Sequence, residues 1–561
     1  MKADLVVVNA NIHTVDPDRP QAQALAIRGE AIEFVGSDAQ VRNVIGSTTQ
    51  VIDAGGRLIV PGFNDAHVHL IMGAEELVGV DLRPSRDEGD MVRRLGRYAA
   101  TLPADEWITG GYWDHEAWPR ARERATARES AALPTRDLID DVTPDHPVFV
   151  KRLDGHMALA NSLAMRLAGL TDDVTSPAGG AVVRDGRGRL TGVFKDAAMD
   201  LVTRAMPQAT GDTILRRARA ALRHAAEVGV TTIQDMTASA AELAAYDTLR
   251  RAGELTARIS SIQNYDAGEH GASGPATGHG DDWLRIGGRK FFADGSMGAS
   301  TAAFFEPYDD DPGTSGLLMH DPDRLEQLVR KADADGFQPV VHAIGDRANT
   351  LVLGIFERLR VSRGTRPMWR PRVEHAQVVR REDLARFETL GVIASIQPSH
   401  CIDDMRWAEA RIGRARCATA YNIRSFVDAG VPIAFGSDWF VAPLDPMVGL
   451  YAAVTRQFPD GTPPGGWFPD ERITLRRAVE YYTSGSAYAE LTEQRKGRLK
   501  RGQLADLVVL SRDIFAVPPR EILETRPVLT IVGGRVVFDA GQLERLGGKD
   551  EPVTANSRDR R

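Results

Sequence analysis

Short apolar runs alternate with amphipathic segments through the middle of the chain. Before Gly229, apolar residues recur at steps of three and four, which is the spacing of one helix face. These residues are Leu215, Ala218, Leu222 and Ala225. The runs that we interpret as strands are 58–63, 229–235, 257–264, 288–293, 337–342, 371–375, 391–397 and 431–436. Eight strands with intervening helices predict an α/β fold, a distorted TIM (β/α)8 barrel whose chemistry lies where the strands end.

The two ends of the chain have a different pattern. Short β-rich runs separated by glycine-containing turns, as in hairpins, occupy 5–8, 24–28, 31–35 and 50–53 and recur at 505–510, 528–531 and 533–538. We therefore predict one small discontinuous β domain from residues 1–57 and 496–546, with the barrel at 58–495. Residues 547–561 are charged and lack apolar periodicity, which predicts a frayed tail.

The stretch between the first two predicted barrel strands is far longer than a normal strand–helix–strand unit. We therefore predict an insertion at residues 80–210. Because this segment follows the end of the first strand, we expect it to cover the barrel mouth and to shape a substrate pocket.

Composition narrows the class of protein. The chain has 561 residues, 43% apolar and 26% charged, as expected for a soluble globular enzyme with more than one core. A net charge of -8 without a long basic block argues against a nucleic-acid partner. Cys401 and Cys417 lack the spacing of a disulfide framework or a thiolate metal site. No apolar run suits a leader peptide or a membrane span, so we expect a cytoplasmic protein with a small-molecule substrate. A homodimer is one option for its assembly.

Candidate chemistry begins after the first predicted strand, at Asn64-Asp65-Ala66-His67-Val68-His69. Residues two apart in a strand point to the same face, so His67 and His69 aim at one point and form half of a metal site. An isolated pair of this kind is more often two polar residues at a strand exit. The other predicted strand ends favour a metal site over this alternative, because they carry Lys290, His342, His375 and Asp438 in barrel order.

Together these segments resemble the amidohydrolase superfamily. The motifs are HVH after the first strand, GGRKFFADGS on the fourth, VVHAIGDRA on the fifth, RVEHAQ on the sixth and FGSDW on the eighth. With the insertion and its RLDGHMALANS stretch, they are similar to the branch that includes N-substituted formamide deformylase. The resemblance covers almost the whole chain, including a β-sandwich formed by both ends. It implies a metal-dependent hydrolase that acts on an amide or another C–N bond.

The resemblance also implies a role for each residue of the site. His67, His69 and Asp438 would bind the inner of two divalent ions, and His342 with His375 would bind the outer one. Zinc is the expected ion because the ligands are mainly imidazoles. A metal-bridging hydroxide would be the nucleophile, and Asp438 would carry the proton from the bridging water to the leaving amine.

Lys290 is the metal ligand with the most alternatives. A lysine cation would repel the ions, so the resemblance implies a carbamate, formed with carbon dioxide, that bridges both of them. As a residue type, however, lysine is more often found on the surface. Lys195 competes for the same role but precedes the second predicted strand, and Asp294 offers a carboxylate on the same strand face.

Four further residues are expected to bind substrate. They are Trp113, Arg152 and His156 of the insertion, and His400 after the seventh strand. Aromatic, guanidinium and imidazole side chains suit an acyl or aryl group and its carbonyl oxygen. The alternatives are that Trp113 packs inside the insertion, that His156 caps a helix starting near Ala158, and that His400 is solvated.

Three functions fit these observations. The favoured one is hydrolysis of a linear amide, such as an N-formyl or N-acyl amine. The second is hydrolysis of a cyclic amide or urea, or a deamination, on the same scaffold. Related deaminases carry a glutamate shortly after the strand-five histidine, where this chain has Gly345 and Asp346, which lowers the deaminase option. The third is a non-catalytic regulatory or binding protein, which has no need for a complete hydroxide-generating set.

Overall fold

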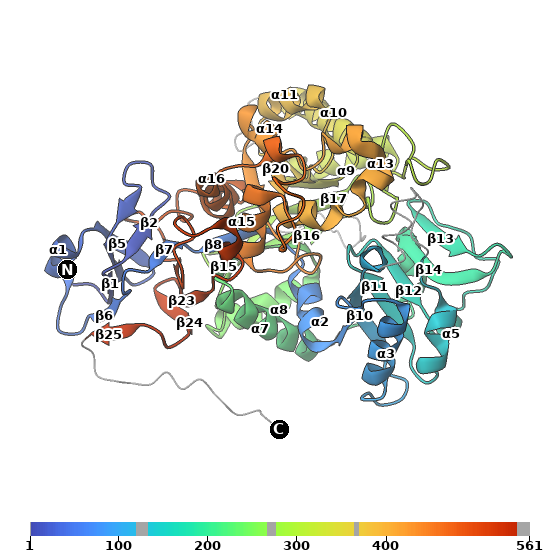
Figure 1. Ribbon diagram of the computed structural model, residues 1–561, viewed down its shortest axis with the longest axis horizontal. Helices are drawn as coiled ribbons and strands as arrows, with labels where there is room; N and C mark the ends of the chain where they lie inside the picture. The colour runs from blue at the N-terminus through green and yellow to red at the C-terminus, as the bar shows by residue number, and fades with distance from the viewer. Residues whose placement is uncertain (1, 119–132, 266–275, 364–369, 547–561) are drawn as a thin grey trace.

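The centre of the molecule is a barrel of eight parallel strands (Figure 1). The computed structural model describes residues 2–118, 133–265, 276–363 and 370–546. In barrel order the strands are β8 (Phe63–Val68), β15 (Val230–Ala238), β16 (Arg258–Asn264), β17 (Leu284–Phe292), β18 (Pro339–Ala343), β19 (Arg372–His375), β20 (Ile393–Ile396) and β21 (Ile433–Phe435). A parallel bridge between Val68 and Trp439 joins the two edges of the sheet. The prediction of a TIM-like barrel is confirmed.

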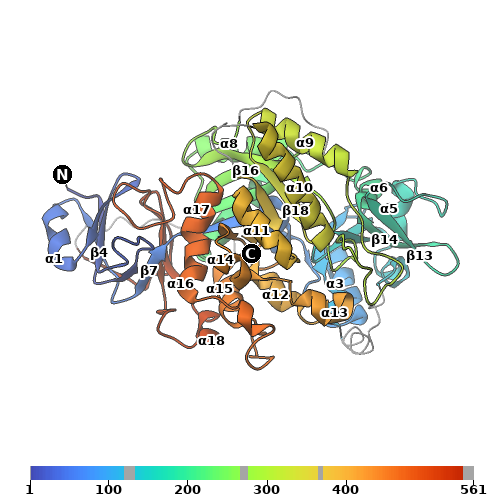
Figure 2. The same cartoon turned by 90° about the horizontal axis from the view of Figure 1, so that it is seen from above.

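Helices surround the barrel (Figure 2). They include α2 (Leu70–Val78), α7 (Gly211–Glu227), α8 (Ala240–Arg251), α9 (Pro322–Ala334), α10 (Asp346–Arg363), α11 (Arg381–Leu390), α12 (Pro398–Asp404), α13 (Ala408–Cys417), α14 (Ile423–Asp428), α15 (Pro446–Thr455) and α16 (Leu475–Glu480). The predicted helix face is seen in α7, where Ala218, Leu222 and Ala225 are buried in the main apolar core. Within the described ranges, no helix is both long enough and apolar enough to cross a membrane.

Two further sheets combine strands from both ends of the chain. One has the order β25 (Glu544–Leu546), β6 (Gln50–Asp53), β1 (Leu5–Val8), β4 (Ala24–Arg28), β5 (Ala31–Gly36). The other has the order β24 (Arg535–Asp539), β23 (Pro527–Val532), β22 (Leu507–Leu510), β7 (Leu58–Pro61), β2 (Asn11–His13), β3 (Gln21–Ala22). The two sheets share one apolar core, with Leu25 from the first and Val509 from the second. The predicted β-sandwich of both termini is confirmed, and the predicted tail at 547–561 lies outside the described residues.

The first barrel strand lies later in the chain than predicted. β7 pairs with β2 and β22 of the terminal sheets, and the chain enters the barrel only with β8. Gly62 allows this crossing, because an added Cβ there would lie 2.2 Å from Thr231 Oγ1. An apolar run is compatible with a strand of the barrel or of a terminal sheet, so the hydrophobic pattern alone does not show which sheet it joins. As a result His67 lies inside β8, and His69 directly follows its end.

The segment between β8 and α7 contains a separate six-stranded sheet. Its order is β13 (Gly180–Arg184), β14 (Leu190–Asp196), β12 (Met157–Ala160), β11 (Val148–Arg152), β10 (Ile108–Trp113), β9 (Val80–Asp81). The helices α3 (Glu88–Ala99) and α5 (Ser162–Leu167) pack against it. Figure 1 places this sheet and the terminal sheets at opposite ends of the barrel.

Candidate metal centre and cavity

The candidate residues meet at the carboxyl ends of the barrel strands. His67 lies in β8 and His69 directly follows it, His342 and His375 lie in β18 and β19, and Asp438 follows β21. The ring centroids of His67 and His375 are 4.9 Å apart, and those of His342 and His375 are 4.6 Å apart. Side chains from four distant segments of the chain therefore share one small space.

Asp438 lies between two pairs of histidines. Its Oδ1 is 3.5 Å from His67 Nε2 and 3.4 Å from His69 Nε2. Its Oδ2 is 3.9 Å from His375 Nδ1 and 3.8 Å from His400 Nε2. The backbone is strained here, since φ is 58° at Asp438 and 71° at His375, values that residues other than glycine seldom adopt. Such strain is typical of functional sites, where the surrounding fold holds it in place.

The spacing of His67, His69 and Asp438 suits three ligands of one metal ion. Zinc bonds of about 2.0 to 2.2 Å place neighbouring ligands of a tetrahedron about 3.3 to 3.6 Å apart. The distances from His67 and His69 to Asp438 Oδ1, 3.5 and 3.4 Å, fall in this range. Asp438 Oδ1 is buried and, within the described part of the chain, has no hydrogen-bond partner. A buried carboxylate oxygen in this position is costly unless a cation binds it, so these three residues are suited to hold one.

A second group of potential ligands consists of His375, His400 and Asp438, whose ligand atoms lie within 4.8 Å of one another. The sequence predicted that His400 contacts the substrate. No motif on α12 shows whether a residue there would bind a metal ion or only line the cavity. His342 lies beside His375 but outside both groups, and its Nε2 donates to Gly295 O at 3.0 Å. The pairing of His342 with His375 around an outer ion stays a prediction.

Burial favours the neutral form of the imidazoles. The pKa values of His67, His342 and His375 lie well below the ordinary value for histidine, first because the rings are buried. Positive charge on neighbouring side chains lowers each pKa further. A neutral imidazole offers a lone pair to a metal ion, whereas an imidazolium does not.

Lys290 is fully buried, so the surface alternative for this residue is wrong. Its Nζ lies 3.3 Å from His67 Nε2. The two competing residues make different contacts. Lys195 Nζ donates to Ala299 O at 2.7 Å. The Asp294 carboxylate accepts three backbone N–H groups, and its Oδ1 lies 3.5 Å from His342 Nε2. Lys290 is therefore the lysine that adjoins His67, a candidate metal ligand.

A cavity extends from these histidines toward the insertion. Arg152, His156 and His400, three of the four residues predicted to bind substrate, line it. Apolar side chains cover other parts of the wall, namely Phe292, Met297, Ile344, Trp407, Phe440 and Val441. Asp403 and Asp404 of α12 also line the cavity, although no sequence motif predicted either residue.

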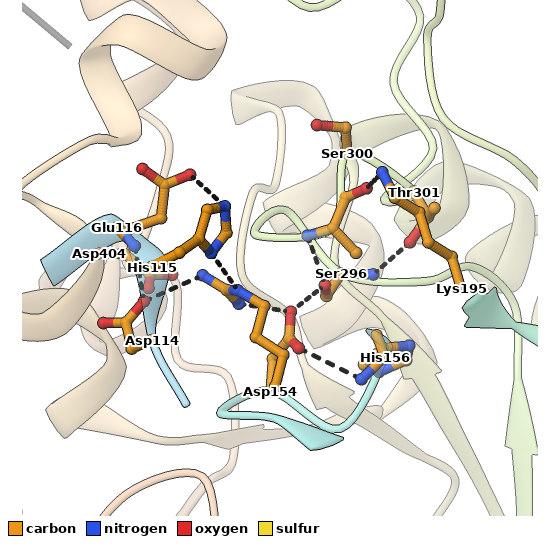
Figure 3. A network of polar contacts seen from close by, with 12 residues as sticks. Asp114, His115, Glu116, Asp154, His156, Lys195, Ser296, Ser300, Thr301 and Asp404 are labelled. Carbon is orange, nitrogen blue, oxygen red and sulfur yellow. Dashed lines mark hydrogen bonds and ion pairs between the residues drawn. The ribbon is translucent and has the colours of Figure 1, made fainter. Parts of the chain in front are cut away.

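The insertion meets the barrel at a set of paired polar groups (Figure 3). Asp154 accepts a hydrogen bond from Ser296 Oγ at 2.5 Å and pairs with Arg152 at 2.8 Å. His156 Nδ1 lies 2.6 Å from Asp196 Oδ1. Burial lowers the pKa of His156, but the hydrogen bond and charge of Asp196 outweigh it, so this pKa lies above the ordinary value. The insertion thus holds His156 in a fixed orientation at the cavity wall.

Trp113 is a core residue of the insertion, which corrects its prediction as a substrate contact. Its ring is fully buried among apolar side chains, and its Nε1 donates to Val150 O at 3.0 Å. Side chains alternate along a strand, and the next residue, Asp114, lines the cavity instead. The helix-cap alternative for His156 is also wrong, because the nearby helix α5 is capped by Asn161.

Known proteins share this fold and this sequence pattern. The model of the Amidohydrolase family matches residues 50–538. The chain is 33% identical to Protein LONG AFTER FAR-RED 3 of Arabidopsis thaliana, over 96% of this chain and 92% of that protein. It is 27% identical to N-substituted formamide deformylase of Arthrobacter pascens, over 96% of this chain and 98% of that protein. The crystal structure of an uncharacterized metal-dependent hydrolase from Pyrococcus horikoshii OT3 gives a TM-score of 0.74 at 27% identity, covering 92% and 99% of the two chains.

A barrel with candidate histidine and aspartate ligands at its mouth, in a chain with these relatives, defines a metal-dependent hydrolase. The resemblance inferred from the motifs is confirmed. The chain belongs to the amidohydrolase family.

Proposed function

We propose that the chain hydrolyses the C–N bond of a linear amide, either an N-formyl or another N-acyl amine. The observation that carries the proposal is the position of Asp438, which contacts His67 and His69 and also lines the cavity. Aromatic side chains of the cavity wall, such as Phe292 and Phe440, suit an apolar substituent on the amine. The similarity to a protein named N-substituted formamide deformylase supports a formyl group as the acyl part.

The same proposal includes two zinc ions. His67, His69 and Asp438 would hold the inner ion, and His342 with His375 would hold the outer one. Ligand sets rich in imidazole suit zinc, and burial lowers the pKa of His67, His342 and His375, which favours their neutral form. When bound, the metal supplies Lewis acidity and lowers the pKa of a coordinated water to about 7.

Asp438 would move the proton of the reaction. Its carboxylate would accept a proton from the attacking water and return it to the leaving nitrogen, because it contacts both the histidines and the cavity. The insertion would complete the site from the opposite side. His156, oriented by Asp196, would donate a hydrogen bond from Nε2 to the carbonyl oxygen of the substrate.

A substrate screen tests the reaction class. We expect the zinc-loaded protein to release formate or another carboxylic acid from N-formyl amines or N-acyl amines, and to act more slowly on hydantoins, cyclic ureas and esters. Acid release followed by liquid chromatography measures each class on the same sample. Turnover confined to hydantoins or cyclic ureas would contradict the linear amide. Absence of turnover from a chain that holds no metal would favour a binding protein.

His156 provides a second test of the proposal. His156→Asn removes the Nε2 donor, and the shorter amide does not reach the same carbonyl oxygen, so we expect kcat/KM to fall by about 10²-fold while the metal content stays native. Asp196→Asn is the matched variant, because asparagine also tolerates the positive φ of 49° at this position. It should cause a smaller loss by loosening the orientation of His156. Native kcat/KM in His156→Asn, or loss of metal in either variant, would contradict this role.

A further inference from the structure

A continuous path of buried polar side chains begins at His67. His67 Nδ1 lies 2.6 Å from Glu374 Oε2, and Glu374 Oε1 forms an ion pair with Arg372 Nε at 2.9 Å. All three side chains have an exposed fraction of 0%. Glu374 occupies the Nδ1 edge of the ring, so the Nε2 edge faces Asp438 and Lys290, at 3.5 and 3.3 Å.

The path continues through the interior of the barrel, away from its mouth. Arg372 donates to Gln234 Oε1 at 2.6 Å, and Gln234 donates to Asn64 Oδ1 at 3.0 Å. Asn64 donates to Glu490 Oε1 at 2.7 Å, and Glu490 pairs with Lys496 at 2.9 Å. None of these residues is more than 5% exposed.

This interior departs from the usual composition of a barrel. Branched apolar side chains normally fill the layers inside a TIM barrel. Here two inward positions of one strand, Arg372 and Glu374, are charged, and Val373 between them belongs to the outer apolar core. A buried ion pair seldom makes a fold more stable than apolar residues of similar volume. Stability alone therefore does not account for these charges, and their contact with His67 points to the metal centre.

We propose that Glu374 is a positioning residue for the metal centre. Its carboxylate keeps the proton of His67 on Nδ1 and leaves the Nε2 lone pair directed at the ion, while the ion pair with Arg372 holds the Glu374 side chain in place. This inference rests on the metal centre of the proposed function and not on the substrate.

The test is zinc affinity, measured without substrate. Metal-free full-length protein is titrated with Zn²⁺ in competition with a chromophoric chelator. We expect Glu374→Gln to bind the tightest zinc about 10- to 100-fold more weakly than the native chain, because the amide carries no charge and no longer fixes the His67 tautomer. Native zinc affinity in this variant would overturn the inference.

Glu490→Gln is the matched control, because it makes the same change from carboxylate to amide at the other end of the path. Glu490 is also buried, but it contacts Asn64 and Lys496 rather than His67. We expect this variant to lower the melting temperature of the metal-free protein and to keep native zinc affinity. An equal loss of zinc affinity in both variants would overturn the inference in favour of a purely structural network.

If Glu374→Gln fails to fold, Glu374→Asp replaces it in the zinc titration. The shorter side chain retains the charge but lengthens the contact with His67, so we expect an affinity between those of the native chain and Glu374→Gln. Native affinity in Glu374→Asp, in the absence of a folded Glu374→Gln, would overturn the inference. A native chain that binds no zinc would overturn the metal centre as well, whereas zinc binding without amide turnover would overturn only the proposed substrate.

Discussion

Asp438→Asn is expected to lower kcat/KM by about 10²- to 10⁴-fold while most of the metal stays bound. Asparagine cannot accept the proton of the attacking water, so the transfer to the leaving nitrogen is lost. The amide oxygen still offers a neutral ligand, and His67 and His69 remain beside it at the distances seen for the native carboxylate. Kinetic assays with the best substrate of the screen, together with elemental analysis of the same sample, give both quantities.

Asp445→Asn is the matched control for this experiment. Asp445 follows the same barrel strand and caps α15 by accepting a hydrogen bond from the Met447 N–H at 3.0 Å. Asparagine caps a helix about as well as aspartate, so activity and stability should stay near native. Near-native activity in Asp438→Asn, or an equal loss in Asp445→Asn, would contradict the role of Asp438 in proton transfer.

Lys290→Ala is expected to reduce metal content and activity together. We propose that Lys290 would carry a carbamate that helps to hold the metal, since its side chain is fully buried beside His67 and a cation there would repel the metal. Removal of the side chain leaves space that a small carboxylate can enter. Addition of a short carboxylic acid with zinc should therefore restore part of the activity, which kinetic assays over a range of acid concentrations measure.

Lys195→Ala is the control for this second prediction. Lys195 is the competing lysine, and its Nζ donates to the carbonyl of Ala299 rather than to a group of the metal centre. We expect native metal content in this variant and no response to added acid. Native metal content in Lys290→Ala, or an equal loss of metal in Lys195→Ala, would show that the carbamate assignment is wrong.

Most of the barrel could be predicted because its strands and helices have different apolar periods. The exception is β7, which is as apolar as a barrel strand and directly precedes one. The hydrophobic pattern indicates that a strand is buried but not to which sheet it belongs. Only Gly62, where a side chain would collide with Thr231, marks the passage from one sheet to the other, and its role is visible only in three dimensions.

The grouping of the candidate metal ligands could be predicted because barrel topology brings strand ends together. The residues that support them could not, since their contacts depend on side chains that cross the barrel interior. Glu374 adjoins His375 in the sequence, yet it contacts His67 of another strand. The residues that line the cavity were harder to predict from the sequence, as Trp113 shows. An aromatic residue in a strand suits a pocket or a core, and only the pairing of that strand decides which face it occupies.

The central claim is that His67, His69 and Asp438 hold a metal ion on which hydrolysis depends. The most direct test is acid release from the best N-formyl or N-acyl amine by one sample, measured as purified, after removal of its metal and after return of zinc. The account predicts turnover in the first state, its loss in the second and its recovery in the third. Full turnover by the metal-free protein, or no turnover in any of the three states, would contradict it.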